Sequence, residues 1–424
     1  MLLLYSFMWW IALPLVLGRL WWRGRKEPGY RQHLGERLGF YGRQRDARPT
    51  IMVHAVSVGE TRAAEPLVEA LLQAWPGYRI LLTHMTPTGR ATGKALFGKH
   101  GDRVIQSFLP YDTRFMVGRF LRHFRPSICI LMETEVWPNL IATCAAHRVP
   151  VALVNARLSE RSLRRGQRFG GLMMQAARGI SLAAAQTEAD AARIASLGAP
   201  RVAVTGSIKF DVVPPEALLD TGAMLRARFA GRPVLLCAST REGEEALILD
   251  AYRALADKPP GMLLLLVPRH PQRFEEVARM AGERGLSLAR RSDLAEFANC
   301  SVDSDVLLGD SMGEMFAYFA ACDCAFIGGS LLPLGGQNLI EACAVGKPVL
   351  VGEHTFNFLQ ATEEAVEAGA ALRVPDAAAL MAAAAGLLRD DARRMRMGER
   401  ALAFAARHRG ATSRTVELLR QIIA

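Results

Sequence analysis

Short aliphatic runs alternate with stretches of helical spacing along most of the chain. In the first half, runs rich in Val, Ile and Leu predict strands over residues 51–56, 79–83, 127–132, 149–154 and 202–205. Apolar residues at helical spacing lie between them, for example over residues 61–74 and 135–146. Strands that alternate with helices indicate a parallel sheet covered by helices on both faces.

The same alternation starts again after two consecutive prolines, Pro214 and Pro215, which interrupt any regular element. Further strands are predicted over residues 233–237, 261–267, 306–308, 324–327 and 348–351. The predicted helices between them include residues 242–256, 272–282 and 337–345. We therefore place a domain boundary near residues 211–215 and expect two Rossmann-like α/β domains, over residues 51–212 and 213–424.

Residues 1–22 have a different pattern, because no charged side chain occurs before Arg19. A bilayer span needs about 20 apolar residues, so the segment is of marginal length for a span. A cleaved signal peptide would carry its positive charge before the apolar run, whereas here the charge follows it. A buried core helix is disfavoured by Trp9-Trp10 and Trp21-Trp22, because tryptophan collects at membrane interfaces. The pattern favours an uncleaved anchor that either spans the membrane or lies in its interface.

Positive charge is concentrated directly behind this apolar segment. The chain of 424 residues has 52 Lys and Arg against 41 Asp and Glu, a net charge of +11. Nine of the basic residues and three of the acids lie between Arg19 and Arg48, so this stretch contributes +6. We expect residues 23–50 to form a basic juxtamembrane segment that binds anionic headgroups and keeps the rest of the chain on the cytoplasmic side.

Composition narrows the class of protein further. Hydrophobic residues make up 50% of the chain and charged residues 22%, which excludes an intrinsically disordered protein. The seven cysteines form no CxxC pair, so neither a disulfide framework nor a zinc site is indicated. Several of them, such as Cys129 and Cys237, lie in apolar runs and are expected to be small core residues.

Ligands of doubly wound sheets bind at the carboxyl ends of the strands, so residues just after the aliphatic runs are candidates. Glu60 follows the first predicted strand, and Ser57 three residues before it indicates a capping box. The alternative is a general base, since a carboxylate there can take a proton from a sugar hydroxyl. Glu133 and Glu135 follow a later strand, where acids can simply cap the next helix. Lys209 is either a solvated loop lysine or a cation that faces an anionic substrate.

Strand ends in the second half carry further candidates. Arg269 either grips a phosphate or forms a surface ion pair. Glu314 lies where a predicted helix begins, and the free backbone N–H groups there can bind an anion. Glu341 follows a glycine-rich stretch at a distance that suits a ribose diol, although glycine also serves tight turns alone. The absence of GxGxxG, Walker A, HExxH and GxSxG motifs at these positions argues against dehydrogenases, NTPases, zincins and α/β-hydrolases.

Short blocks of the chain match, in order, those of a known enzyme family. They are Arg23-Gly24-Arg25-Lys26, Ser57-Val58-Gly59-Glu60, Met85-Thr86-Pro87-Thr88-Gly89, Met132-Glu133-Thr134-Glu135, Asn155-Ala156-Arg157-Leu158-Ser159, Lys209-Phe210-Asp211, Pro268-Arg269-His270-Pro271, Met312-Gly313-Glu314 and His354-Thr355-Phe356-Asn357-Phe358. With these blocks the chain resembles, from end to end, the 3-deoxy-D-manno-octulosonic acid (Kdo) transferases of lipopolysaccharide synthesis.

The resemblance implies a GT-B glycosyltransferase, an α/β fold with a cleft between two Rossmann-like domains, together with an N-terminal membrane-anchor helix. It implies inverting transfer of Kdo from CMP-Kdo to a lipid A precursor, lipid IVA, at the cytoplasmic face of the bacterial inner membrane. The resemblance implies neither a metal nor a cofactor, and it implies CMP-Kdo as the donor substrate. The implied partners are CMP-Kdo, the lipid A precursor and the anionic membrane surface, and not a nucleic acid.

The resemblance also assigns residues. Glu60 matches the family's catalytic base, and Glu133 and Lys209 match positions that stabilise the transition state. The CMP-binding positions match Pro268, Arg269, Met312, Gly313, Glu314, Asn338 and Glu341. The chain departs from the family at Gln337, where a histidine is usual. Glutamine can donate a hydrogen bond but carries no charge, so a role for imidazolium at this position is in doubt.

Other functions stay open from the residues alone. A UDP-sugar transferase or a UDP-sugar epimerase would also have two Rossmann-like domains, although an epimerase of soluble sugars has no need for an anchor. A membrane-attached basic module without enzymatic activity is the alternative from a different class. Nucleic-acid binding is disfavoured, because the basic stretch adjoins the anchor and contains no motif that reads bases.

Overall fold

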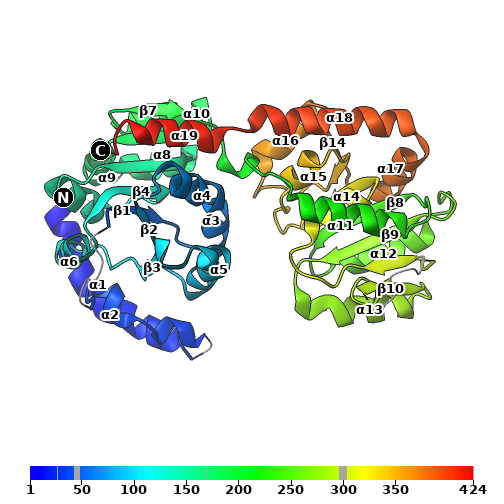
Figure 1. Cartoon of the computed structure of the whole chain (residues 1–424), viewed down its shortest axis with the longest axis horizontal. Coiled ribbons are helices and arrows are strands. Elements are labelled where there is room, and N and C mark those ends of the chain that lie inside the picture. The colour runs from blue at the N-terminus through cyan, green and yellow to red at the C-terminus, as the bar shows by residue number, and fades with distance from the viewer. Residues whose placement is uncertain (26, 43–47, 169, 296–302, 424) are drawn as a thin grey trace. The chain divides into compact units, whose positions relative to one another are not determined.

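The computed structural model describes residues 1–25, 27–42, 48–168, 170–295 and 303–423. The chain forms two compact units, Met1–Asp211 with Arg409–Ala424, and Val212–His408 (Figure 1). Each unit contains one seven-stranded sheet in which all paired strands are parallel. The expectation of two Rossmann-like α/β domains is therefore confirmed.

The first sheet has the strand order β3-β2-β1-β4-β5-β6-β7. Its strands are β1 (Thr50–His54), β2 (Arg79–His84), β3 (Val104–Phe108), β4 (Pro126–Met132), β5 (Val151–Ala156), β6 (Leu182–Ala185) and β7 (Val202–Val204). The helices of this unit are α1 (Leu2–Arg23), η1 (Pro28–Arg31), α2 (Leu34–Arg37), α3 (Val58–Ala63), α4 (Glu65–Ala74), α5 (Pro87–Phe97), η2 (Gly98–Arg103), α6 (Arg114–Phe124), α7 (Pro138–Ala146), α8 (Glu160–Arg168), α9 (Gly170–Arg178), α10 (Glu188–Ser196), η3 (Ile208–Phe210) and α19 (Ala411–Arg420).

Both faces of this sheet are buried, which explains the continuous aliphatic runs. Along β1, Ile51 and Val53 join one apolar core with Leu71 of α4. Met52, between them, points to the other face and joins a second core with Phe120 of α6. Successive side chains of a strand point to opposite faces, so a strand between two helical layers needs apolar residues at every position.

The second sheet has the strand order β10-β11-β9-β8-β12-β13-β14. Its strands are β8 (Val234–Thr240), β9 (Leu263–Pro268), β10 (Leu288–Arg290), β11 (Val306–Leu308), β12 (Cys324–Ile327), β13 (Val349–Val351) and β14 (Ala371–Arg373). Its helices are α11 (Glu216–Ala227), α12 (Glu244–Ala254), η4 (Pro271–Arg273), α13 (Phe274–Glu283), η5 (Asp293–Ala295), α14 (Met315–Ala321), α15 (Ile340–Ala344), α16 (Leu359–Glu367), α17 (Ala377–Arg389) and α18 (Asp391–His408).

The strands that the sequence did not predict are β3, β6, β10 and β14. Strand β6 has the sequence Leu-Ala-Ala-Ala, in which alanine favours helices. Strands β10 and β14 are three residues long and end in arginine. These short segments are strands because a neighbouring strand pairs with them, which overrides their local preference.

The last helix returns to the first unit, whereas we expected residues 213–424 to form one domain. Val416 and Leu419 of α19 complete the apolar core around Leu67 and Leu71 of α4. The carboxylate of Asp211 accepts the backbone N–H groups at the start of α19. An apolar face that completes the first core, together with this cap, places the boundary of the second unit at His408.

The expected juxtamembrane segment 23–50 is largely part of the first unit. The Arg37 side chain is buried, and its Nη1 donates to the Met85 carbonyl at 3.1 Å. Glu36 accepts a hydrogen bond from Arg90 Nη1 at 2.6 Å and from the N–H of Phe108 at 2.8 Å. Lys26 and residues 43–47 lie outside the described residues. The basic excess between Arg19 and Arg48 therefore serves packing as well as surface charge.

Helix α1 exposes most of its apolar side chains. Within the described ranges, α1 is the single helix long and apolar enough to cross a membrane, with a mean hydropathy of 1.5. None of its residues is fully buried against the protein. Its exposed large apolar side chains are Leu3, Leu4, Phe7, Met8, Trp10, Ile11, Leu15, Trp21 and Trp22, and that of Met1 before the helix is exposed as well.

Candidate active site

Glu60 lies in the first turn of α3, directly after β1. Its Oε2 accepts the N–H of Val56 at 2.9 Å, and the Ser57 hydroxyl donates to its Oε1 at 3.3 Å. Ser57 is the N-cap and accepts the N–H of Glu60. The Ser57 half of the expected capping box is present, while the Glu60 carboxylate binds the N–H of Val56, one residue before the N-cap, and the Ser57 hydroxyl. These bonds fix the carboxylate at the end of the strand. Burial raises the pKa of Glu60, and the nearby charge of Glu133 raises it further.

Glu133, directly after β4, and Lys209, in η3, are brought together. Lys209 Nζ lies 3.2 Å from Glu133 Oε1, and Arg157 Nε lies 3.5 Å from Glu133 Oε2. Glu133 is 8% exposed and has a left-handed backbone with φ of 54°. Such a conformation is costly for a residue other than glycine and persists where the surroundings enforce it. The two residues assigned to one role by resemblance thus form one ion pair.

Asn155 at the carboxyl end of β5 holds the segment that carries Lys209. Its Oδ1 accepts the N–H of Ile208 at 3.1 Å, at the start of η3. Asn155 is fully buried and also has a positive φ, 51°. The sequence showed Asn155 only as part of a matching block, and its positioning role becomes visible in the fold.

Glu135 is a third carboxylate in this cluster. Its Oε2 accepts a hydrogen bond from Trp137 Nε1 at 2.8 Å. Burial, followed by the charge of Glu60, raises the pKa of Glu135 to about 7. From the sequence, Glu135 was expected at most to cap the next helix, and the two acids in Met132-Glu133-Thr134-Glu135 were the signal for a cluster.

The block Met85–Gly89 supports the turn that carries Glu60. The Thr86 hydroxyl donates to the Val56 carbonyl at 3.2 Å, and Thr86 also caps α5 by accepting the N–H of Gly89. A Cβ on Gly89 would lie 3.3 Å from the backbone of Val56 and of Ser57. Glycine is therefore needed here for the close approach of α5 to this turn.

In the second unit, Pro268 and Arg269 lie at the end of β9. Pro268 is the last residue of this strand, and its neighbour in β8 is Thr240. The N–H of Arg269 donates to the Thr240 carbonyl at 2.9 Å. The backbone of Arg269 is thus fixed by the sheet, while its side chain is half-buried at the strand end.

Met312, Gly313 and Glu314 form the turn between β11 and α14. Gly313 has a positive φ of 85°, and Met312 is 57% exposed. Arg291 Nη2 donates to Glu314 Oε1 at 3.1 Å, and the Ser311 hydroxyl donates to Oε2 at 2.5 Å. Both carboxylate oxygens of Glu314 are held by side chains of the same unit.

Asn338 and Glu341 lie at the start of α15. Asn338 Oδ1 accepts the N–H of Ile340 at 3.0 Å, and its Nδ2 donates to Glu341 Oε1 at 3.1 Å. The helix begins at Ile340, three residues later than predicted. Gln337 belongs to the preceding turn, where its N–H donates to the Gly328 carbonyl at 3.0 Å.

Glu244 organises the glycine-rich loop after β12, a role that no motif around it indicates. The fully buried carboxylate accepts the N–H groups of Arg241 at 2.9 Å, Gly329 at 2.6 Å and Leu331 at 3.0 Å. In the sequence it is one of several acids, beside Glu242 and Glu245. The fold shows that Glu244 and Glu245 are both buried, Glu245 against Arg273, while Glu242 is exposed.

The predicted nucleotide-binding residues share one edge of the second sheet. They follow β9, β11 and β12, whose carboxyl ends lie on the same side because the strands are parallel. A guanidinium and backbone N–H groups at such an edge can bind a phosphate. Across the residues that the structure describes, no three His, Cys, Asp or Glu side chains are grouped so that they could hold a metal ion.

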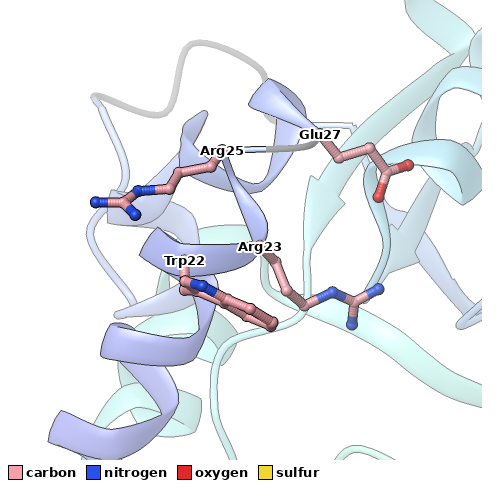
Figure 2. A pocket seen from close by; sticks show the side chains of 4 residues that line it. All are labelled: Trp22, Arg23, Arg25 and Glu27. Carbon is pink, nitrogen blue, oxygen red and sulfur yellow. The ribbon is translucent and has the colours of Figure 1, made fainter.

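A pocket of about 420 Å³ lies at the C-terminal end of α1, away from these clusters in sequence. Its lining residues are Trp22, Arg23, Arg25 and Glu27. Figure 2 shows Arg23 and Glu27 extending to one side of the helix end and Arg25 to the other. None of these side chains is a predicted catalytic or nucleotide-binding residue.

Comparison with known proteins gives two family matches. The family described as 3-deoxy-D-manno-octulosonic-acid transferase (kdotransferase) matches residues 32–212, and glycosyl transferases group 1 matches residues 238–404. The 3-deoxy-D-manno-octulosonic acid transferase of Bordetella pertussis is 48% identical over 414 residues, which is 96% of each chain. The enzyme of the same description from Haemophilus influenzae is 41% identical and covers 97% of this chain and 96% of its own.

Solved structures agree on the fold. Anabaena Alr3699/HepE in complex with UDP has a TM-score of 0.59 at 16% identity and covers 88% of this chain and 100% of its own. UDP-GlcNAc 2-epimerase from Neisseria meningitidis has a TM-score of 0.58, also at 16% identity and the same coverage. The predicted GT-B fold class is confirmed. From its matches over nearly the whole length, the chain belongs to the 3-deoxy-D-manno-octulosonic acid transferase family and is a glycosyltransferase.

Proposed function

We propose that this enzyme transfers Kdo from CMP-Kdo to lipid IVA with inversion at the anomeric carbon, and that Glu60 is the general base. One observation carries the proposal. A half-buried carboxylate, fixed at a strand end, lies within electrostatic range of the Glu133–Lys209 ion pair. A base, an anion and a cation are the groups that this transfer needs.

The geometry of Glu60 suits proton removal from a sugar hydroxyl. Its two oxygens are held by the N–H of Val56 and the hydroxyl of Ser57, so the carboxylate does not have to be ordered during the reaction. Its raised pKa makes it a stronger base than an exposed glutamate.

Glu133 and Lys209 suit the charges that change during transfer. Kdo leaves CMP through an oxocarbenium-like state, in which positive charge develops near the anomeric carbon. An adjacent carboxylate stabilises that charge, and a lysine ammonium can bind the carboxylate that Kdo itself carries. The ion pair at 3.2 Å supplies both groups, Glu133 from the end of β4 and Lys209 from η3.

The second unit suits the nucleotide. A CMP-sugar contains a single phosphate, so a guanidinium such as that of Arg269 can replace the metal that many diphosphate-sugar enzymes use. Pro268, Met312, Gly313, Glu314, Asn338 and Glu341 are proposed to complete the CMP site. Gln337 is proposed to contribute by hydrogen bonding alone, since its side chain carries no charge.

Helix α1 is proposed to hold the enzyme at the cytoplasmic face of the inner membrane, in the plane of the interface. Its exposed apolar side chains suit burial among acyl chains, and Trp22 with Arg23 and Arg25 at its end suits the headgroup level. An in-plane orientation is favoured because Tyr5 and Ser6, near the helix start, hydrogen-bond to the folded unit.

The donor assignment has a direct test in calorimetry of the full-length enzyme with CMP and with UDP. We expect binding of CMP in preference to UDP. Preference for UDP would overturn the proposal in favour of a UDP-sugar enzyme of the same fold. Binding of neither nucleotide, together with salt-sensitive binding to anionic vesicles, would favour a membrane-attached module without enzymatic activity.

A further inference from the structure

The first turns of α1 are joined to the first unit by polar groups. The Tyr5 hydroxyl donates to Oδ2 of Asp112 at 3.0 Å. The Ser6 hydroxyl donates to Oδ1 of Asn139 at 2.9 Å. An anchor that served only to enter lipid would not require hydrogen bonds to side chains of the folded unit, so these contacts indicate a second role for the helix.

Asp112 lies at the N-terminus of α7. Its Oδ2 accepts the N–H of Asn139 at 3.0 Å, and its Oδ1 accepts the N–H of Leu140 at 2.8 Å. The N-cap residue of α7 is Trp137, whose side chain makes no cap hydrogen bond. The first N–H groups of a helix need acceptors from elsewhere. Asp112, which is 1% exposed, supplies the acceptor that Trp137 lacks.

Tyr5 supports the charged form of Asp112. Burial raises the pKa of Asp112 to about 6. The hydrogen bonds from Tyr5 of α1 and from the Asn139 and Leu140 N–H groups of α7 counteract this rise. The ionised carboxylate is the better acceptor for two N–H groups at once. The Tyr5 hydroxyl therefore strengthens the cap of α7.

The segment between β4 and α7 carries the acidic groups of the candidate site. It extends only from Glu133 to Trp137, so the start of α7 lies close to both carboxylates in the chain. Trp137 donates to Glu135, and its ring packs edge-on against His54 with ring centroids 6.2 Å apart. A shift of the first turn of α7 would move this short, packed segment with it.

We propose that α1 is a brace for the active site, with Tyr5 and Ser6 as positioning residues. By binding Asp112 and Asn139, they hold the first turn of α7 and, through it, the segment with Glu133 and Glu135. This inference rests on the proposed function. It gives α1 two faces with separate roles, a polar contact that positions the site and an exposed apolar face that contacts the membrane.

The test uses full-length enzyme in detergent micelles with CMP-Kdo and lipid IVA. Tyr5→Phe removes one hydroxyl that donates to a buried carboxylate, and we expect kcat to fall by roughly tenfold while KM for CMP-Kdo stays unchanged. The matched control is Leu4→Ala, on the next residue, whose side chain is 58% exposed. It should keep kcat in micelles and bind vesicles of anionic phospholipid more weakly, whereas Tyr5→Phe should bind them like the wild type.

Hydrogen exchange at Asn139 and Leu140 gives a readout that does not depend on activity. These amides should exchange faster in Tyr5→Phe and at the wild-type rate in Leu4→Ala. A second variant, Asp112→Asn, should lower kcat at least as much as Tyr5→Phe does. Wild-type kcat in Tyr5→Phe, or a lower kcat without faster exchange at α7, would overturn the brace. Absence of Kdo transfer by the wild-type enzyme would instead overturn the proposed function.

Discussion

Each sheet has one point at which the strand order reverses, and the side chains at the two points differ in their chemistry. The strand order reverses between β1 and β4 in the first sheet and between β8 and β12 in the second. In the first, the strand ends carry Glu60 and Glu133 beside Lys209. In the second, the corresponding ends carry a glycine-rich loop held by Glu244.

The two points differ in the hydrogen bonds that the carboxylates of Glu244 and Glu60 accept. Glu244 accepts three backbone N–H groups and so acts as part of the scaffold. Glu60 accepts one backbone N–H and one hydroxyl, and burial raises its pKa. A raised pKa suits a group that takes up a proton, whereas three backbone donors hold a carboxylate in place. The comparison therefore predicts a base in the first unit and a scaffold in the second.

The largest effect is expected at Glu60. Glu60→Gln keeps the shape of the side chain but cannot accept a proton, so kcat should fall by about 100- to 10,000-fold. CMP affinity, measured by calorimetry, should be unchanged because the proposed CMP site lies in the second unit. The matched control is Glu65→Gln in the first turn of α4, which should transfer Kdo at the wild-type rate.

Glu244→Gln tests whether Glu244 holds the glycine-rich loop in place. The amide places its own N–H₂ group against backbone donors, so the glycine-rich loop should lose order and CMP binding should weaken by about tenfold to 100-fold. Transfer at saturating CMP-Kdo should fall much less. Glu242→Gln, whose side chain is exposed two residues earlier, is the control. Unchanged CMP affinity in Glu244→Gln would show that this loop does not shape the nucleotide site.

Arg269 tests the phosphate contact. Arg269→Ala should weaken CMP binding by roughly tenfold, the usual loss for a hydrogen bond to a charged group, with a much smaller change in affinity for cytidine. Arg279→Ala, which breaks an exposed pair with Glu283, should change neither. Equal losses for CMP and cytidine would place Arg269 away from the phosphate.

The smallest effect is expected in the pH dependence of stability, at Glu135. Its pKa is raised to about 7, so the folded protein favours the protonated carboxyl group. Stability is therefore lost as pH rises from the ordinary pKa of a glutamate toward 7, and no more is lost above 7. Glu135→Gln cannot ionise, so the variant should lose less stability than the wild type between about pH 5 and 7. Thermal unfolding at each pH measures the difference, and the same pH dependence in both proteins would contradict the raised pKa.

The sequence predicted the β/α alternation and most central strands because these are buried on both faces and lie in continuous aliphatic runs. It missed β3, β6, β10 and β14. Strand β6 is rich in alanine, and β10 and β14 are three residues long, so their composition does not distinguish them from helix or loop. The sequence named Glu60, Glu133 and Lys209 through matching blocks, but not the pairing of the last two. Asp112, Asn155 and Glu244 could not be singled out, because a buried polar residue is recognised by its partners, and these are distant in the chain.

The most direct test of the account is the mass of the lipid product. Wild-type enzyme and Glu60→Gln are incubated in parallel with CMP-Kdo and lipid IVA, and the lipids are analysed by mass spectrometry. We expect the lipid product of the wild type to gain the mass of at least one Kdo. Glu60→Gln, which should still bind CMP, should give no such gain in the same time. A wild-type product without mass gain under conditions where a known Kdo transferase is active, or full transfer by Glu60→Gln, would contradict the account.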